Sequence, residues 1–196
     1  MHREVRSSTL ARMRRISIVI SALAASACGG GGGPAEQVDA AVGSIDAPAG
    51  VEDLDMKATD FECVLRWTIV GGYRITNKLG HDPLPVANNP SGGGAFPVGT
   101  IIQIVPTEAM VKRRTGFDAT THDWEFFALA VSASGTTINK RGTSDVINAF
   151  GGNCLTCHAK AMPAFDLVCG TTHGCDPLPL SEAQLISLQN SDARCS

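Results

Sequence analysis

The stretch DWEFFALAVSASGTTINKRG, residues 123–142, decides the fold class of this chain. It is rich in aromatic and β-branched residues, which favour strands. Ser134-Gly135 lies inside it, at a position where a turn would join two strands. The stretch therefore predicts a β-hairpin, and it makes the middle of the domain β rather than helical.

Side chains alternate between the two faces of a strand, so this stretch also predicts how its aromatic residues divide. We expect Trp124 and Phe126 to share one face and Phe127 to lie on the other, together with Glu125. One of the two aromatic sets should pack against the core or a cofactor.

The flanking segments complete an α+β reading. FPVGTIIQIVP, residues 96–106, predicts another strand, and residues 107–114 read either as a short helical turn or as an extension of that strand. Apolar residues at helical spacing in 60–72 predict a first amphipathic helix that ends at Gly71-Gly72, and 73–94 reads as a long loop. SEAQLISLQN, 181–190, predicts a terminal helix with Ser181 as its N-cap.

Composition suits one soluble globular domain with an addition at one end. The chain has 196 residues, a formal net charge of −3 and 43% hydrophobic residues. Outside the N-terminal segment it has no basic stripe, so nothing in the charge pattern indicates a nucleic-acid partner.

The N-terminal segment reads as an export signal. A basic start runs into ISIVISALAASA, an apolar stretch closed by small residues, and 1–27 is predicted to be a lipoprotein-type signal peptide. Cys28 follows a sequence that resembles a bacterial lipobox and is the predicted lipidation site; the alternative is an ordinary cleaved signal with an incidental thiol. Residues 28–54 form a predicted flexible Gly/Ala/Pro-rich tether, and 55–196 the folded domain. We expect a membrane-anchored lipoprotein of the periplasm or cell envelope.

Export places the seven cysteines in an oxidising compartment, where thiols tend to be paired or otherwise occupied. Cys63, Cys169, Cys175 and Cys195 allow three pairings, and the sequence does not choose among them. One hypothesis is that Cys169 and Cys175 close the short loop GTTHG, which leaves Cys63 to fasten the C-terminal tail at Cys195.

GGNCLTCHAKAM, residues 151–162, carries the chemistry. Cys154 and Cys157 admit three interpretations: a redox pair, half of a zinc site, or the two thioether anchors of a c-type haem. No strand signal precedes the pair as a thioredoxin-type site requires, and the remaining zinc candidates, Cys169 with His173 and Cys175, are irregularly spaced. Haem c accounts for the whole motif, because two thiols three positions apart lie on one side of a helical turn and His158 then becomes the axial iron ligand.

Three segments make the resemblance specific. AFPVGTIIQI, HDWEFFAL and GGNCLTCHAKAMPAFDLV resemble, in order and rough spacing, the cytochrome P-460 and cytochrome c′-beta family over about residues 67–168. That resemblance implies a mainly antiparallel β-sheet with flanking helices and a covalently attached haem c on one face. It also implies His158 as the only protein ligand and an apolar distal side for a small gas or nitrogen-oxide ligand. The candidate distal-pocket residues are Phe96, Ile102, Ile104, Trp124, Phe126 and Phe127.

One feature of the family is not matched. Members that oxidise hydroxylamine have a lysine covalently joined to the haem, carried in many relatives on the strand after Phe-Pro-x-Gly-Thr. Here that strand reads IIQI, and the next lysine is Lys112. Lys112 takes this role if 107–114 extends the strand; the interpretation we favour is that Lys112, Arg113 and Arg114 form a solvated cationic cluster.

The other methionines and histidines that could bind iron are better explained as core, surface or loop residues. Met110 and Met162 read as core filler, and His81, His122 and His173 as surface or loop histidines, with His173 the best alternative ligand. Glu125 reads either as a proton acceptor in the distal pocket or as a carboxylate at a sheet edge.

These observations predict an exported, lipid-anchored mono-haem cytochrome that binds a small gas such as nitric oxide or exchanges electrons with a redox partner protein. The alternatives are a haem enzyme that oxidises hydroxylamine or nitric oxide, and a disulfide-stapled exported domain without haem, in which Cys154 and Cys157 pair with each other. The reduced haem is expected to be five-coordinate and high-spin.

Overall fold

The computed structural model describes residues 50–195. The predicted signal peptide, the lipidation site Cys28 and the tether up to residue 49 lie outside the described residues. Asp53 and Leu54, which were assigned to the tether, belong to the domain. Asp53 forms an ion pair with Arg113, and Leu54 packs against a core cluster.

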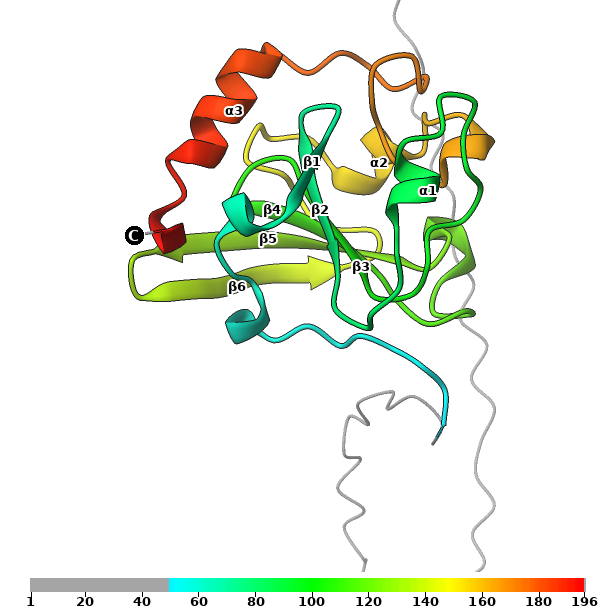
Figure 1. Ribbon diagram of the computed structural model, residues 1–196, viewed down its shortest axis with the longest axis horizontal. Coiled ribbons are helices and arrows are strands. Elements are labelled where there is room, and N and C mark those ends of the chain that lie inside the picture. Colours follow the sequence, from blue (N-terminus) through cyan, green and yellow to red (C-terminus); the bar gives the residue numbers. More distant parts are fainter. Residues whose placement is uncertain (1–49, 196) are drawn as a thin grey trace, which may run out of the picture. The chain divides into compact units, whose positions relative to one another are not determined.

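Six strands form one antiparallel sheet in the order of the chain, β1 to β6 (Figure 1). They are β1 Thr68–Val70, β2 Tyr73–Asn77, β3 Thr100–Gln103, β4 Glu108–Lys112, β5 Trp124–Ser132 and β6 Gly135–Gly142. Every neighbouring pair is antiparallel, so short connections can join consecutive strands, although residues 78–99 form a long connection between β2 and β3.

Helices are short and lie around the sheet. The α-helices are α1 Leu84–Ala87, α2 Cys154–His158 and α3 Glu182–Asn190; the 3-10 helices are η1 Ala58–Asp60, η2 Val64–Arg66, η3 Ala119–Thr121, η4 Pro163–Phe165 and η5 Ala193–Cys195. The fold is therefore α+β with a mainly antiparallel sheet, as the sequence and the resemblance predicted. No helix within residues 50–195 has the length and apolar character needed to span a bilayer.

The predicted hairpin is confirmed. Strands β5 and β6 pair along their length, from Ser132 opposite Gly135 next to the turn to Phe126 opposite Gly142. One register shift occurs between Ala128 and Leu129. The predicted terminal helix is confirmed as α3, where the Ser181 side chain and Gln184 form a reciprocal capping box.

Three local predictions were wrong. Residues 60–72 do not form an amphipathic helix: they give η2 and then β1, and Gly71 and Gly72, both at positive φ, turn the chain into β2. Part of the predicted loop 73–94 is therefore strand β2. The segment 107–114 is neither a helical turn nor an extension of β3, because its central residues form the separate strand β4. In each case pairing with a neighbouring strand outweighed a local signal, which was helical apolar spacing in 60–72 and turn-rich composition in 73–94.

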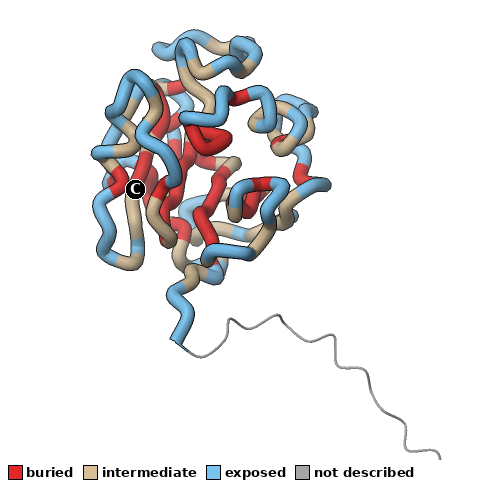
Figure 2. Tube along the Cα trace, turned by 90° about the vertical axis from the view of Figure 1, so that its right-hand side faces the viewer, coloured by how far each residue is buried: buried red, intermediate tan, exposed pale blue. Residues whose placement is uncertain are grey.

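The sheet separates two apolar clusters. The first, here called the α2 face, contains Trp124, Phe126 and Met110 and is covered by α2 and by buried residues of the chain after it, such as Val168. The second, the N-terminal face, contains Phe127, Ile101 and Val111 and is covered by side chains from residues 54–67. Figure 2 shows the buried residues concentrated at the centre of the domain beneath exposed loops.

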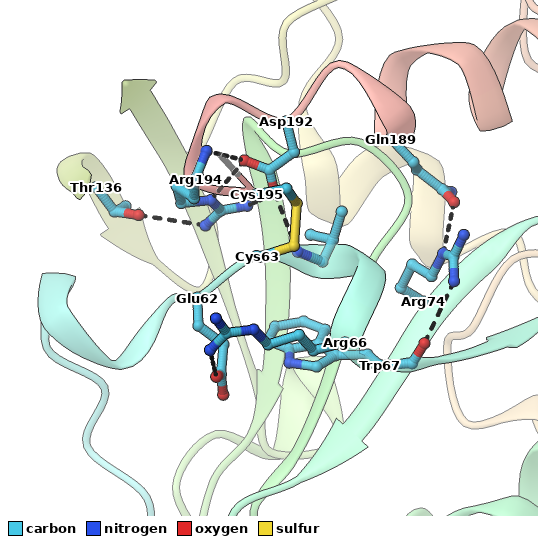
Figure 3. Close-up of a disulfide and its surroundings, with 11 residues drawn as sticks. Glu62, Cys63, Arg66, Trp67, Arg74, Thr136, Gln189, Asp192, Arg194 and Cys195 are labelled. Atoms are coloured by element: carbon cyan, nitrogen blue, oxygen red, sulfur yellow. Dashed lines mark hydrogen bonds and ion pairs between the residues drawn. A yellow bond between two sulfur atoms is a disulfide. The ribbon is translucent and has the colours of Figure 1, made fainter. Parts of the chain in front are cut away.

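The ends of the domain are joined covalently. Cys63 and Cys195 form a disulfide across 132 residues, next to the ion pair of Asp192 with Arg194 (Figure 3). Asp192 also accepts a hydrogen bond from the Val64 backbone at 3.0 Å. Cys169 and Cys175 form the second disulfide, so both bonds of the hypothesised pairing are present.

Candidate haem attachment site

The CxxCH motif forms the one-turn helix α2, Cys154–His158, on one face of the sheet. Asn153 caps it, since its side chain accepts a hydrogen bond from the Thr156 backbone at 2.9 Å. The Cys154 backbone donates to Val146 O at 3.0 Å, which anchors the helix start to the preceding segment. The sequence thus places both cysteines and the histidine on a single, locally specified turn.

Cys154 and Cys157 are the two free thiols among the described residues. Cys154 is buried and Cys157 is half-buried. The disulfide between them that a haem-free domain would require is not formed, whereas the other four described cysteines are paired.

The environment of Cys154 does not match an activated redox thiol. Burial, with a smaller contribution from the charge of Glu108, raises the pKa of Cys154 to about 11. Thioredoxin-type nucleophiles have a lowered pKa. A zinc site that uses Cys169 and Cys175 is also excluded, because these two cysteines form a disulfide with each other. The described residues contain no cluster of three or more His, Cys, Asp or Glu side chains that could hold a metal ion.

His158 is oriented by a backbone carbonyl. Its Nδ1 lies 2.7 Å from Leu167 O, and because a carbonyl only accepts, the proton must be on Nδ1. Burial lowers the pKa of His158, and the bond to Leu167 O opposes that shift. The ring also packs against Phe126, with centroids 5.2 Å apart. The imidazole is therefore held with a lone pair on Nε2, which is the state that binds iron.

These residues fit a c-type haem. The motif offers two unpaired thiols for the vinyl groups and one neutral imidazole for the iron, from a single turn of helix. When bound, the haem would supply the redox and gas-binding chemistry, and the chain would supply the attachment, the axial ligand and the apolar surroundings.

The structure brings together most of the predicted pocket residues. Phe96, Ile102, Trp124 and Phe126 are buried in the α2-face cluster, and Ile104 packs at its margin. Phe127 was wrongly included, because it lies on the N-terminal face with Phe61 and Val111. The reason is the strand alternation that already separated it from Phe126 in the sequence.

The prediction of a solvated cationic cluster was wrong. Lys112 and Arg113 are 5% and 6% exposed, and strand alternation sends them to opposite faces. Lys112 pairs with Asp166 at 2.7 Å, and Arg113 pairs with Asp53 at 2.8 Å. Both charges can be buried because each has a carboxylate partner.

Glu125 was considered as a proton acceptor in the distal pocket or as a carboxylate at a sheet edge, and it is neither. It lies on β5, which is flanked by β4 and β6, and it faces away from α2. Its carboxylate is 2.5 Å from Arg113 and 2.6 Å from Arg141. Glu125 is therefore part of the charge network that fastens the N-terminal face.

The remaining candidate ligands divide by burial. Met110 is 4% exposed in the α2-face cluster, as expected of a core residue, whereas Met162 is 45% exposed and is not core filler. His81 is exposed and lies 2.8 Å from Glu52, and His122 is exposed and lies 3.3 Å from Asp166. The side chain of His173, in contrast, is held by both a hydrogen bond and a ring stack.

His173 lies within the Cys169–Cys175 loop. Its Nδ1 is 2.8 Å from Val168 O, and its ring stacks on Phe165 with centroids 3.8 Å apart. This histidine resembles His158 in being held by a carbonyl, but it lacks the neighbouring pair of thiols.

Sequence reasoning missed Asp166 and Leu167. Asp166 is buried and joins Lys112 to the Phe96 backbone, while the carbonyl of Leu167 orients His158. No local sequence signal indicates these roles. FDLV, residues 165–168, looks like an ordinary apolar segment with one acid, and the roles depend on partners up to 70 residues away.

A surface depression of about 400 Å³ lies elsewhere, lined by residues that include Arg66, Trp67, His81, Asp82 and Leu84. None of the residues predicted to bind haem lines it.

Comparison of the chain with protein-family models, with curated proteins and with solved structures found no match.

Proposed function

We propose that this chain is an exported mono-haem c-type cytochrome, related to the cytochrome P-460 and c′-beta family and held at the membrane by a lipid on Cys28. One observation carries the proposal. Cys154 and Cys157 are left as free thiols while the other four described cysteines are paired, and His158 on the same helix is held in its iron-binding tautomer by Leu167 O.

Phe126 would pack beside the axial ligand, because its ring centroid lies 5.2 Å from that of His158. The gas-binding site would be lined by apolar side chains of the α2-face cluster, such as Ile102 and Trp124. A small neutral diatomic would enter such a site at lower desolvation cost than an anion.

We propose gas binding in preference to electron transfer through a six-coordinate iron. Met110 is buried in the α2-face cluster beside Phe126, its partner across strands β4 and β5, and is accounted for as a core residue. Met162 is largely exposed, and His173 is stacked on Phe165. The reduced haem is expected to be five-coordinate and high-spin; a six-coordinate low-spin spectrum that changes in Met162→Ala or His173→Ala would contradict this and favour the electron-transfer class.

The enzymatic alternative requires a lysine that reacts with haem. Lys112 faces the α2 side, but its ammonium is held by Asp166 at 2.7 Å and by His122 O at 2.6 Å. An ammonium with both acceptors in place is a poor nucleophile, so we place oxidation of hydroxylamine or nitric oxide second. An absorption spectrum shifted far to the red of ordinary haem c, and lost in Lys112→Ala, would reverse this order.

The decisive experiment is co-expression with c-type haem maturation machinery, followed by a denaturing gel stained for haem. The wild type should stain, and the double variant Cys154→Ala/Cys157→Ala should not. Cys169→Ser/Cys175→Ser is the matched control, because it also removes two neighbouring sulfurs but should keep the stain. His158→Ala should retain covalent haem with altered iron ligation, and an unstained wild-type band would end the proposal.

A further inference from the structure

Asp166 is a buried carboxylate on which several separate elements converge. It is 4% exposed, and its Oδ2 accepts hydrogen bonds from the Phe96 backbone at 2.8 Å and from Lys112 Nζ at 2.7 Å. Its backbone oxygen accepts from Trp124 Nε1 at 2.7 Å, and His122 Nδ1 lies 3.3 Å from Oδ1. Strands β4 and β5 and the segment before β3 are thus tied to a single residue.

The backbone at this point is unusual. Asp166 and Leu167 have φ values of 50° and 62°, so two consecutive non-glycine residues are left-handed. Such a conformation costs free energy and persists only where the surroundings over-determine it. The contacts to Asp166 supply that constraint.

The consequence of the turn is the direction of one carbonyl. Leu167 O, immediately after Asp166, accepts the hydrogen bond from His158 Nδ1 at 2.7 Å. A donor bond at the second nitrogen fixes the tautomer and ring orientation of a ligating histidine and raises its basicity. Whatever holds the 166–167 turn therefore also sets the state of His158.

Resting on the proposed haem function, we propose that the buried Lys112–Asp166 ion pair is a positioning device for the axial ligand His158. It acts through the left-handed Asp166–Leu167 turn, by way of the hydrogen bond from His158 to Leu167 O, and so tunes the bond between His158 and iron.

An ion pair suits this role better than apolar packing would. Lys112 has a second acceptor in His122 O and lies over the Trp124 ring, 5.1 Å from its centroid, so its position is defined in several directions. Removing either charge leaves the other buried with only its remaining contacts, His122 O for Lys112 and the Phe96 backbone and His122 for Asp166. This loss of compensation should displace the turn.

The test uses the haem-loaded protein and the variants Asp166→Asn and Lys112→Met. Haem content is measured first. The stretching frequency of the iron–histidine bond in the reduced protein is then measured by resonance Raman. Both variants should shift this frequency downward, because a weaker Leu167 bond makes His158 a weaker donor. Lys112→Arg, which keeps the charge, should remain closest to the wild type.

Asp192→Asn is the matched control. Asp192 is also 4% exposed and ion-paired, with Arg194 at 2.7 Å, but it lies beside the Cys63–Cys195 disulfide. It should lose stability without moving the iron–histidine frequency. An unchanged frequency in haem-loaded Asp166→Asn or Lys112→Met, or an equal shift in Asp192→Asn, would overturn the inference alone; a wild type that carries no haem would instead refute the proposed function. If one of the two variants does not fold, the other decides.

Discussion

The face of the sheet that carries Phe127 packs against residues 54–67, whereas the face that carries Phe126 packs against the CxxCH helix. On the N-terminal face the buried charges are matched within the chain: Glu125 lies between Arg113 and Arg141, and Arg113 also reaches Asp53. On the α2 face the groups around the motif are left uncommitted: two free thiols and an imidazole whose Nε2 makes no hydrogen bond within residues 50–195.

This difference separates a stabilising face from a chemical one. The N-terminal face is supported by ion pairs and by the long-range disulfide, so it can hold the sheet rigid. Within residues 50–195, the α2 face keeps two free thiols and the unbonded Nε2 of His158, which are the groups that the proposed haem attachment needs. Stability and site identity should accordingly respond to different substitutions.

The largest expected effect concerns the two disulfides. Cys63–Cys195 spans 132 residues and Cys169–Cys175 spans 6. By the chain-entropy model the first contributes about 5 kcal/mol and the second about 2 kcal/mol. Cys63→Ser/Cys195→Ser should therefore lower the urea midpoint far more than Cys169→Ser/Cys175→Ser, as measured by unfolding of each purified variant. Equal losses would show that the long-range bond does not dominate the support of the N-terminal face.

The next comparison uses two neighbouring aromatic residues. Phe126 and Phe127 are 2% and 0% exposed, so Phe126→Ala and Phe127→Ala should each cost about 3–5 kcal/mol. Only Phe126 contacts His158, hence only Phe126→Ala should alter the absorption spectrum of the reduced haem protein. The two measurements are urea unfolding and visible spectroscopy. A spectral change of the same size in Phe127→Ala would contradict the division of the faces.

The smallest effects come from one acid on each face. Burial alone would raise the pKa of Asp53, but hydrogen bonds from Arg113 and Arg114 and the charge of Arg113 outweigh it, and the pKa is lowered below 3.8. A carboxyl whose pKa is lower in the folded state stabilises the fold at pH values above its unfolded-state pKa. This stabilisation is lost as the pH falls through the folded-state pKa. Asp53→Asn should therefore reduce the acid sensitivity of the urea midpoint below about pH 4.

Glu108 on the α2 face has the opposite sign. Burial raises its pKa above 4.5, against a hydrogen bond from the Ala149 backbone. The folded state binds the proton of Glu108 more tightly than the unfolded state does, so the ionised carboxylate destabilises the fold at pH 7. This destabilisation disappears as the pH falls from the raised folded-state pKa to the unfolded-state value of 4.5. Glu108→Gln should raise the midpoint at pH 7 and leave it unchanged near pH 4. Parallel pH profiles for wild type and variant would contradict the sign.

The sequence alone determined the features that depend on short-range chemistry. Aromatic and β-branched composition with the Ser134-Gly135 turn predicted the hairpin, and strand alternation assigned Trp124 and Phe126 to one face. Ser181 predicted the N-terminus of α3. The spacing of Cys154, Cys157 and His158 put them on one helical turn. These signals are local because they depend on side-chain periodicity and capping within a few residues.

Only the tertiary structure decided the rest. Residues 60–72 have helical spacing but become β1 and a glycine turn, because β2 offers a pairing partner that no local pattern reveals. Lys112 reads as a surface charge but is buried, because Asp166, 54 residues later, neutralises it. His158 is oriented by the Leu167 carbonyl, which follows Asp166, a residue held by contacts from three distant segments. Strand pairing and the burial of charge are settled by partners remote in the chain, and a sequence read locally does not contain those partners.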